Sequence, residues 1–252
     1  MAKIYLVRHC EAEGNVTRRM QANAEALVTA RGYAQCECLR RRFEGVHIDA
    51  VYSSDAFRAI QTALPLAEER GLRLRVSLAL REIAAGVWED TAIMAEYPEA
   101  YRRWRQTPWD LATPGCSSFQ EVGERLLCGL RAIAREIGPD GVAVAASHSC
   151  AIKAAQCLML QKPMTEMKEM GHGENTSVSL LHFYADGTIR VAYRNDVSHL
   201  PPELRQEHIG VPPADINVAV YPARLPEQAD VLLDLASQEA AQRGVAFNGS
   251  QW

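Results

Sequence analysis

An arginine and a histidine stand side by side at positions 8 and 9, directly after the apolar run Ile4–Val7. The run predicts a β-strand, and open α/β sheets bind their ligands at the carboxyl ends of the strands. A guanidinium group beside a potentially nucleophilic imidazole suits attack on a phosphoryl group, whose spread negative charge matches the donors of arginine. Because a solvated Arg next to a surface His is common, the rest of the chain must supply the remaining groups.

Three further segments place Arg58, Glu82 and His148 beside predicted strand ends. Two arginines can hold a phosphoryl group without a metal, since each charge-assisted hydrogen bond contributes about 1.5–3 kcal/mol. In an empty pocket they would repel each other, so we expect phosphate or sulfate in the resting site. Their field disfavours protonation of His9 and keeps its lone pair available for attack. Glu82 is the carboxyl group best placed to protonate a leaving oxygen.

Strand and helix patterns alternate along the chain, which predicts an α/β fold, a three-layer αβα sandwich with a mainly parallel central sheet. A Ser with a Glu three residues later predicts a capping box at the start of the longest helix. The predicted strands and hairpin are 4–7, 50–53, 72–76, 142–147, 176–184, 188–193 and 217–221. The predicted helices are 29–43, 55–70, 118–137, 151–160 and 226–243.

We expect a catalytic domain over residues 1–200. Residues 89–117 interrupt the alternation with a helical piece, 93–105, and a proline-containing loop. An insertion at this position is where lids and specificity elements usually lie. Residues 201–252 then form a C-terminal tail or a truncated second element.

Composition excludes several classes of protein. The 252 residues carry a net charge of −4 and have no tract rich in Lys and Arg, so no nucleic-acid surface is indicated. The seven cysteines fit no metal-binding CxxC spacing and indicate reduced thiols. Without a signal-peptide pattern or an apolar run near 18 residues, we expect a cytoplasmic protein that does not use a membrane. Its oligomeric state stays open.

The chain resembles the histidine phosphatase superfamily, also called the phosphoglycerate mutase-like family, over about residues 3–200. That resemblance rests on motifs that follow one another in the family's order. They are Arg8-His9-Cys10, Asn15, Ser53-Ser54 with Arg58, Glu82 with Gly86, Trp88 and Glu89, His148, 175–178 and 195–200. The chain departs from the family pattern at Cys10 and Ser149, where glycines are usual.

The resemblance implies that His9 is the phosphorylated nucleophile and Glu82 the proton donor, and that no cofactor takes part. The residues implied to hold the phosphoryl group are Arg8, Asn15, Arg58 and His148. We assign substrate specificity to Gln21 in the first loop and to a cationic helix face in the insertion. That face consists of Arg102, Arg103 and Arg105.

These residues predict a metal-independent phosphomonoester hydrolase that acts through a phosphohistidine on a small phosphorylated metabolite. A phosphoglycerate mutase-type transfer is an alternative, and it needs a site that excludes water and binds a carboxylate. A non-catalytic phospholigand-binding module is the other alternative, supported only by the departures at Cys10 and Ser149. We disfavour a metal site built from His9, His148 and Glu82, because neighbouring arginines oppose a cation.

Overall fold

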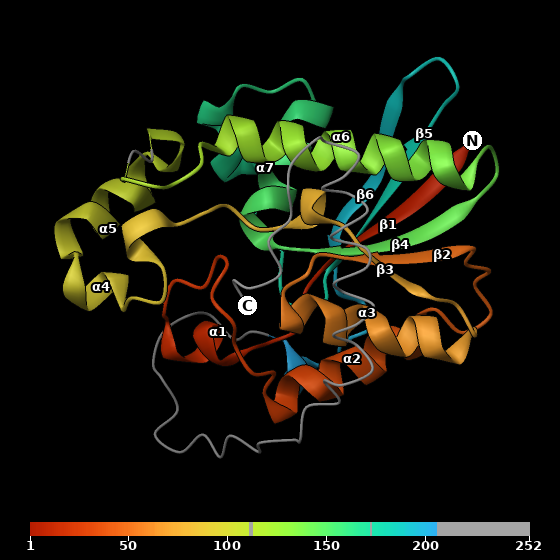
Figure 1. The fold of residues 1–252 in the computed structure, drawn as a ribbon, viewed down its shortest axis with the longest axis horizontal. Helices are drawn as coiled ribbons and strands as arrows, with labels where there is room; N and C mark the ends of the chain where they lie inside the picture. The colour runs from red at the N-terminus through yellow and green to blue at the C-terminus, as the bar shows by residue number, and fades with distance from the viewer. Residues whose placement is uncertain (111–112, 172, 206–252) are drawn as a thin grey trace, which may run out of the picture.

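A computed structural model of the chain describes residues 1–110, 113–171 and 173–205 (Figure 1). At its centre lies a six-stranded sheet with strand order β3-β2-β4-β1-β5-β6. β3, β2, β4 and β1 are parallel to one another, whereas β5 is antiparallel to both β1 and β6. The strands are β1 (Ala2–Arg8), β2 (Ala50–Ser53), β3 (Leu74–Val76), β4 (Val142–Ser147), β5 (Val178–Phe183) and β6 (Ile189–Asp196). The sheet is therefore mainly parallel, as predicted.

Helices cover both faces of the sheet (Figure 1). α2 (Ala30–Arg42) and α3 (Phe57–Glu69) enclose one buried cluster, and α6 (Phe119–Ile137) and α7 (Ser149–Met159) enclose the other. This arrangement confirms the three-layer αβα sandwich. The described helices also include α1 (Glu13–Thr17), α4 (Ile93–Glu96) and α5 (Pro98–Gln106). Within these ranges no helix is long and apolar enough to cross a bilayer.

The capping box at the start of α6 is confirmed. Ser118 Oγ accepts a hydrogen bond from Glu121 N at 3.2 Å, and the Glu121 carboxylate accepts one from Ser118 N at 2.8 Å. The helix ends at Gly138, whose φ of 72° suits a residue without a Cβ. Local sequence alone therefore fixes both ends of this helix.

The helix α7 begins at Ser149, two residues before the predicted start at Ala151. His148 is the extended residue that precedes it, and the Glu82 carboxylate accepts hydrogen bonds from the first-turn N–H groups of Cys150 and Ala151. A carboxylate from a distant segment thus satisfies the helix start, which no pattern within residues 149–160 could indicate.

The single helix predicted over 93–105 is wrong, because α4 and α5 are separated at Tyr97. Pro98 has no N–H to continue the first helix, and it disfavours helical backbone in the residue before it. The chain before and after the insertion comes close together at Gly86 and Pro114. Gly86 has a φ of 58°, and a Cβ at this residue would lie 2.1 Å from the Pro114 carbonyl oxygen. The strand and helix predicted for 217–243 lie outside the described residues.

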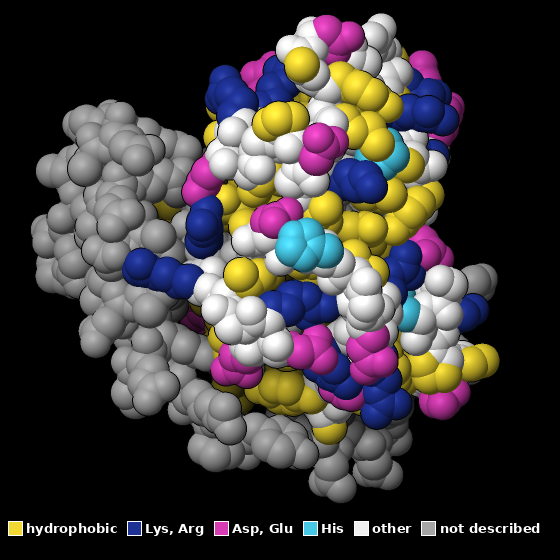
Figure 2. All heavy atoms as spheres, turned by 90° about the vertical axis from the view of Figure 1, so that its right-hand side faces the viewer, with side chains coloured by type: hydrophobic (Ala, Val, Ile, Leu, Met, Phe, Trp, Pro, Cys, Tyr) yellow, Lys and Arg dark blue, Asp and Glu magenta, His cyan; other side chains and the backbone are white. Residues whose placement is uncertain are grey.

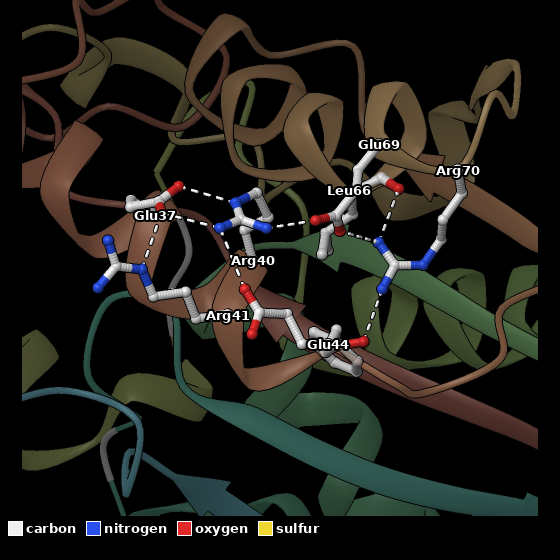
Figure 3. Close-up of polar contacts among 8 residues, drawn as sticks. Glu37, Arg40, Arg41, Glu44, Leu66, Glu69 and Arg70 are labelled. Carbon is white, nitrogen blue, oxygen red and sulfur yellow. Dashed lines mark hydrogen bonds and ion pairs between the residues drawn. The ribbon is translucent and has the colours of Figure 1, made fainter.

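A network of charged side chains joins α2 to α3 on the outer surface (Figure 3). Arg40 contacts Glu37 at 2.9 Å and Glu44 at 3.2 Å on its own side of the network, and it reaches Glu69 on α3. Arg70 closes the network on Glu69 at 2.8 Å. Exposed pairs contribute only about 0–1 kcal/mol each, so the buried faces of these helices supply most of the packing energy.

Candidate active site

His9 follows the carboxyl end of β1 and is 5% exposed. Its Nδ1 lies 2.6 Å from the carbonyl oxygen of Cys10. Because a carbonyl only accepts, Nδ1 carries the hydrogen and Nε2 keeps the lone pair. Burial, followed by the positive charges of Arg58 and Arg8, holds the pKa of His9 well below its ordinary value. At neutral pH the ring is therefore uncharged.

Arg8 is the last residue of β1 and is 5% exposed. Its Nη1 donates to the carbonyl oxygen of Gly173 at 2.5 Å, and burial lowers its pKa to about 10, which leaves it charged at neutral pH. Thr176 N donates to the Arg8 carbonyl oxygen at 3.0 Å, and Asn175 Nδ2 donates to that of His9 at 2.9 Å. The segment that leads into β5 therefore supports the strand end that carries both residues.

Arg58 lies in the first turn of α3 and is 1% exposed. Its guanidinium group donates to three backbone carbonyl oxygens of one loop, those of Ala24 at 3.2 Å, Gln21 at 3.0 Å and Ala22 at 2.9 Å. Nη2 also lies 3.3 Å from His148 Nδ1. The predicted phosphate-binding arginine thus also ties the first loop to the second histidine.

His148 follows β4 and is fully buried. Since Arg58 can only donate, Nδ1 of His148 accepts its hydrogen bond, and Nε2 therefore donates to Ser54 Oγ at 2.7 Å. The ring centroids of His148 and His9 are 5.1 Å apart. Burial, Arg58 and His9 hold the pKa of His148 well below its ordinary value. Sequence reasoning gave Ser54 no role, although it lies in the motif that ends with Arg58.

Glu82 is 8% exposed, and its carboxylate lies at the amino-terminal end of α7. It accepts hydrogen bonds from the backbone N–H groups of Ile83 at 2.9 Å, Cys150 at 3.1 Å and Ala151 at 2.9 Å. Its negative charge acts on Arg8, whose pKa it raises against the effect of burial. The carboxyl group is therefore held on the same edge of the sheet as the two arginines and the two histidines.

The structure gives Asn15 and Gln21 supporting contacts at this edge. Asn15 Oδ1 accepts hydrogen bonds from Ala12 N at 3.0 Å and from Asn175 Nδ2 at 3.3 Å. The Gln21 side chain lies against Gly14, where an added Cβ would be 1.9 Å from Gln21 Oε1. Gly14 thus leaves the space that the Gln21 side chain occupies, with Gly14 and Asn15 in α1 and Gln21 in the loop that follows it.

The predicted cationic helix face of the insertion lies apart from this cluster. Arg102, Arg103 and Arg105 are exposed on α5, and Arg102 contacts Pro98 O at 3.4 Å and Glu99 at 3.9 Å within the same helix. The helix packs instead through Tyr101 and Trp104, which join the small apolar cluster of the insertion. No hydrogen bond or ion pair described for these arginines reaches the residues around His9.

Sequence reasoning also gave no role to Glu89. Its Oε1 accepts hydrogen bonds from three consecutive backbone N–H groups, those of Ala22 at 2.8 Å, Asn23 at 2.9 Å and Ala24 at 2.8 Å. These residues belong to the loop whose carbonyl oxygens accept from Arg58. The Glu89 carboxylate therefore accepts from the N–H groups of this loop, while the Arg58 guanidinium donates to its carbonyl oxygens. The only sequence clue was the position of Glu89 directly after a tryptophan in the family motif.

The departure at Cys10 is accommodated by packing. Cys10 is fully buried, and its side chain joins an apolar cluster with Val28 and Cys36. Its backbone N donates to Thr62 Oγ1 at 2.8 Å. The thiol therefore fills a gap in the core beneath the site and leaves the His9 geometry described above in place.

This geometry has counterparts in known proteins. A family model of the histidine phosphatase superfamily (branch 1) matches residues 4–196. The chain belongs to this superfamily. Its phosphatase-named relatives and this membership make it an enzyme of the phosphatase type. Among the described residues, no group of three or more His, Cys, Asp or Glu side chains is arranged to hold a metal ion.

Several histidine phosphatases are similar in sequence or structure. Phosphoserine phosphatase 1 of Hydrogenobacter thermophilus is 30% identical over 185 residues, which cover 72% of this chain and 87% of the relative. The probable phosphoglycerate mutase GpmB of Salmonella typhi is 30% identical, covering 79% and 95%. Bacillus stearothermophilus YhfR superposes with a TM-score of 0.74 at 28% identity, covering 79% and 99%. A mycobacterial glucosyl-3-phosphoglycerate phosphatase complexed with VO3 has a TM-score of 0.69 at 26% identity, covering 77% and 98%.

Proposed function

We propose that this histidine phosphatase hydrolyses phosphomonoesters of small metabolites through a phosphohistidine at His9, without a metal ion. The observation that carries the proposal is the hydrogen bond from His9 Nδ1 to the Cys10 carbonyl oxygen, which leaves Nε2 with a lone pair. Arg8 and Arg58 surround the ring with positive charge and keep it neutral. An anionic phosphoryl group is drawn to this charge, and a nucleophile is already oriented there.

The proposed reaction has two steps. In the first, the lone pair on His9 Nε2 attacks phosphorus in line, the bond to the ester oxygen breaks, and protonated Glu82 gives that oxygen its proton. In the second, the Glu82 carboxylate takes a proton from water, whose oxygen attacks phosphorus and breaks the N–P bond. Phosphate leaves, and His9 regains its lone pair. Arg8 and Arg58 stabilise the charge on the phosphoryl oxygens throughout.

Asn15 and His148 are proposed to contact the phosphoryl oxygens. Both ring nitrogens of His148 have partners in the structure, and the 3.3 Å contact with Arg58 is longer than the 2.7 Å contact with Ser54. An incoming phosphoryl oxygen would take the place of the Arg58 contact with the ring in its other tautomer, in which Nδ1 donates and Nε2 accepts from the Ser54 hydroxyl. Solved relatives are described as complexes with VO3 and with inorganic phosphate. We expect phosphate or sulfate to occupy the same position in the resting enzyme here.

A mutase-type transfer is the second candidate, because one relative is named a probable phosphoglycerate mutase. It would use the same phosphohistidine but return the phosphoryl group to the bound acid in place of water. The buried His9 suits either outcome, since burial limits the access of water.

The test is phosphate release from p-nitrophenyl phosphate in the presence of EDTA. His9→Ala should reduce the rate by at least about 10³-fold, because the nucleophile is lost. His47→Ala is the matched control, since His47 is exposed at the opposite end of the sheet and pairs with Asp49. Equal rates for wild type and His9→Ala would show that His9 is not the nucleophile, and inhibition by EDTA would contradict metal independence. Interconversion of phosphoglycerates without phosphate release would favour the mutase.

A further inference from the structure

A half-buried lysine, Lys153, lies in the second turn of α7 near the predicted active site. It makes no hydrogen bond or ion pair with any residue that the structure describes. By contrast, Lys162 just beyond the same helix contacts Glu166 at 2.6 Å and Glu169 at 2.9 Å. Cations withdrawn from solvent are normally paired, so a half-buried lysine without such a contact points to a ligand.

Lys153 lines a recess that shares a wall with the predicted active site. The recess is lined mainly by Arg8, Ser149, Ile152, Lys153, Gln156 and Asn195. The four residues from α7 are spaced i, i+3, i+4 and i+7, which places them on one face of the helix. Side chains of an α-helix lean toward its amino-terminal end. The helix therefore directs Lys153 toward the sheet edge that carries His9.

The charges around Lys153 favour an anion. Burial lowers its pKa, and the positive charges of Arg8 and Arg105 lower it further, against opposing effects of Cys150 and Cys157. Arg8 from β1 and Lys153 from α7 thus line one recess, and Arg105 from the insertion helix α5 acts on Lys153 from outside the lining. An anion placed among them would relieve their mutual repulsion.

We propose that Lys153 and Arg8 form a subsite for a carboxylate of the substrate, next to the phosphoryl site. The proposal rests on the proposed function and narrows its substrate class to phosphomonoesters with a carboxylate a few atoms from phosphorus. One lysine with a shared arginine and the neutral Ser149 and Gln156 suits a monoanion better than a second phosphate, which carries nearly twice the charge.

The test compares ligands that differ only in the carboxylate. 3-Phosphoglycerate is paired with glycerol 3-phosphate, and O-phosphoserine with O-phosphoethanolamine. For each pair, kcat/KM is measured for wild type, Lys153→Met and Lys153→Arg, with Lys162→Met as the matched control on a paired lysine. Binding of the same ligands is measured by calorimetry in the His9→Ala protein, with and without Lys153→Met.

The wild type should favour the carboxylate member of at least one pair by about 10- to 100-fold, the effect of one charge-assisted contact. Lys153→Met should bring that ratio close to one, whereas Lys153→Arg and Lys162→Met should retain most of it. A wild type without such a preference would overturn the subsite. So would a Lys153→Met variant whose kcat/KM falls equally for both members of a pair. If the wild type releases no phosphate, the proposed function fails, and the calorimetric preference for the carboxylate member still decides the subsite.

Discussion

The two ends of the central sheet treat their charged side chains in opposite ways. At the amino end of the parallel strands the charges are exposed and pair with one another, as Arg75 does with Glu136 and His47 with Asp49. Figure 2 looks at this end, and its basic and acidic side chains are interspersed among apolar ones. At the carboxyl end Arg58 is buried and bonded to carbonyl oxygens and an imidazole nitrogen. Pairing cancels charge at one end, whereas neutral partners preserve the charge of Arg58 at the other.

This difference separates a structural surface from a ligand site. A buried guanidinium that only neutral groups hold keeps its full charge in a low-dielectric setting, where it acts strongly on an entering anion. The Glu82 carboxylate is bonded to backbone N–H groups rather than to Arg58, so its charge acts on Arg58 only from a distance. Substitutions at the two ends should therefore differ in kind, with catalytic effects confined to the carboxyl end.

The largest effect is expected for Glu82→Gln. An amide cannot deliver a proton to a departing alkoxide, so kcat for alkyl phosphates should fall about 10²–10⁴-fold. p-Nitrophenyl phosphate, whose leaving group needs less protonation, should be slowed much less. Steady-state rates on both substrate types measure the difference. Equal slowing of both would remove Glu82 from the acid role.

A smaller loss is expected for Glu89→Gln, which acts on the site through the first loop. The amide has one acceptor oxygen without charge, so the loop and the Arg58 guanidinium should lose their fixed position. We expect about a tenfold drop in kcat/KM and weaker inhibition by phosphate, each charge-assisted bond being worth about 1.5–3 kcal/mol. Glu136→Gln at the amino end is the control. A lower melting temperature with unchanged KM and phosphate inhibition would assign Glu89 a purely structural role.

The pH dependence should show the lowered pKa of His9. In the proposed mechanism the neutral ring is the nucleophile, so activity should be present above the pKa of His9 in the folded enzyme and be lost as pH falls through it. Because burial and the arginines lower that pKa, kcat/KM on p-nitrophenyl phosphate should change by less than about threefold between pH 7.5 and 6.5. The acidic decline should begin below the ordinary histidine value of 6.5. A decline centred at or above that value contradicts the proposed environment of His9.

The smallest effect is expected for Arg75→Gln at the amino end. The substitution breaks an exposed ion pair with Glu136 and a 3.0 Å hydrogen bond to the Tyr52 hydroxyl. Such pairs contribute about 0–1 kcal/mol, so the urea midpoint should shift slightly and kcat/KM should stay within about twofold. A large loss of activity would mean that charges at the amino end affect catalysis at the carboxyl end, contrary to the expectation that catalytic effects are confined to the carboxyl end.

Local sequence was sufficient for elements whose ends and burial it encodes directly. The strands at 50–53 and 142–147 were predicted with their observed bounds, since each is a short apolar run buried in the sheet. The prediction for the insertion is wrong at Pro98, because the helical sequence pattern continues across a residue that ends the preceding helix. α1 was missed because five residues are too few to show a helical period.

The candidate site was predictable as a set of residues but not as a set of contacts. Motif order brought His9, Arg58 and His148 together, because parallel strands end at one edge. The carbonyl oxygens that hold Arg58 belong to a loop without secondary structure, and only tertiary packing places them there. The sequence predicts no contact for Asn175. Its hydrogen bond to His9 arises because β5 runs antiparallel to β1 and therefore starts at the edge of the sheet where β1 ends.

The position of β1 at the centre of the sheet has a consequence for the order in which the molecule can be made. Its two neighbours are β4 and β5, which end at Ser147 and Phe183. During synthesis on the ribosome, β1 emerges before both of its partners and must wait for them. Long-range pairing of this kind folds slowly and leaves apolar strands open to aggregation or chaperones meanwhile. Phosphatase activity in a nascent chain would therefore report that its sheet is complete.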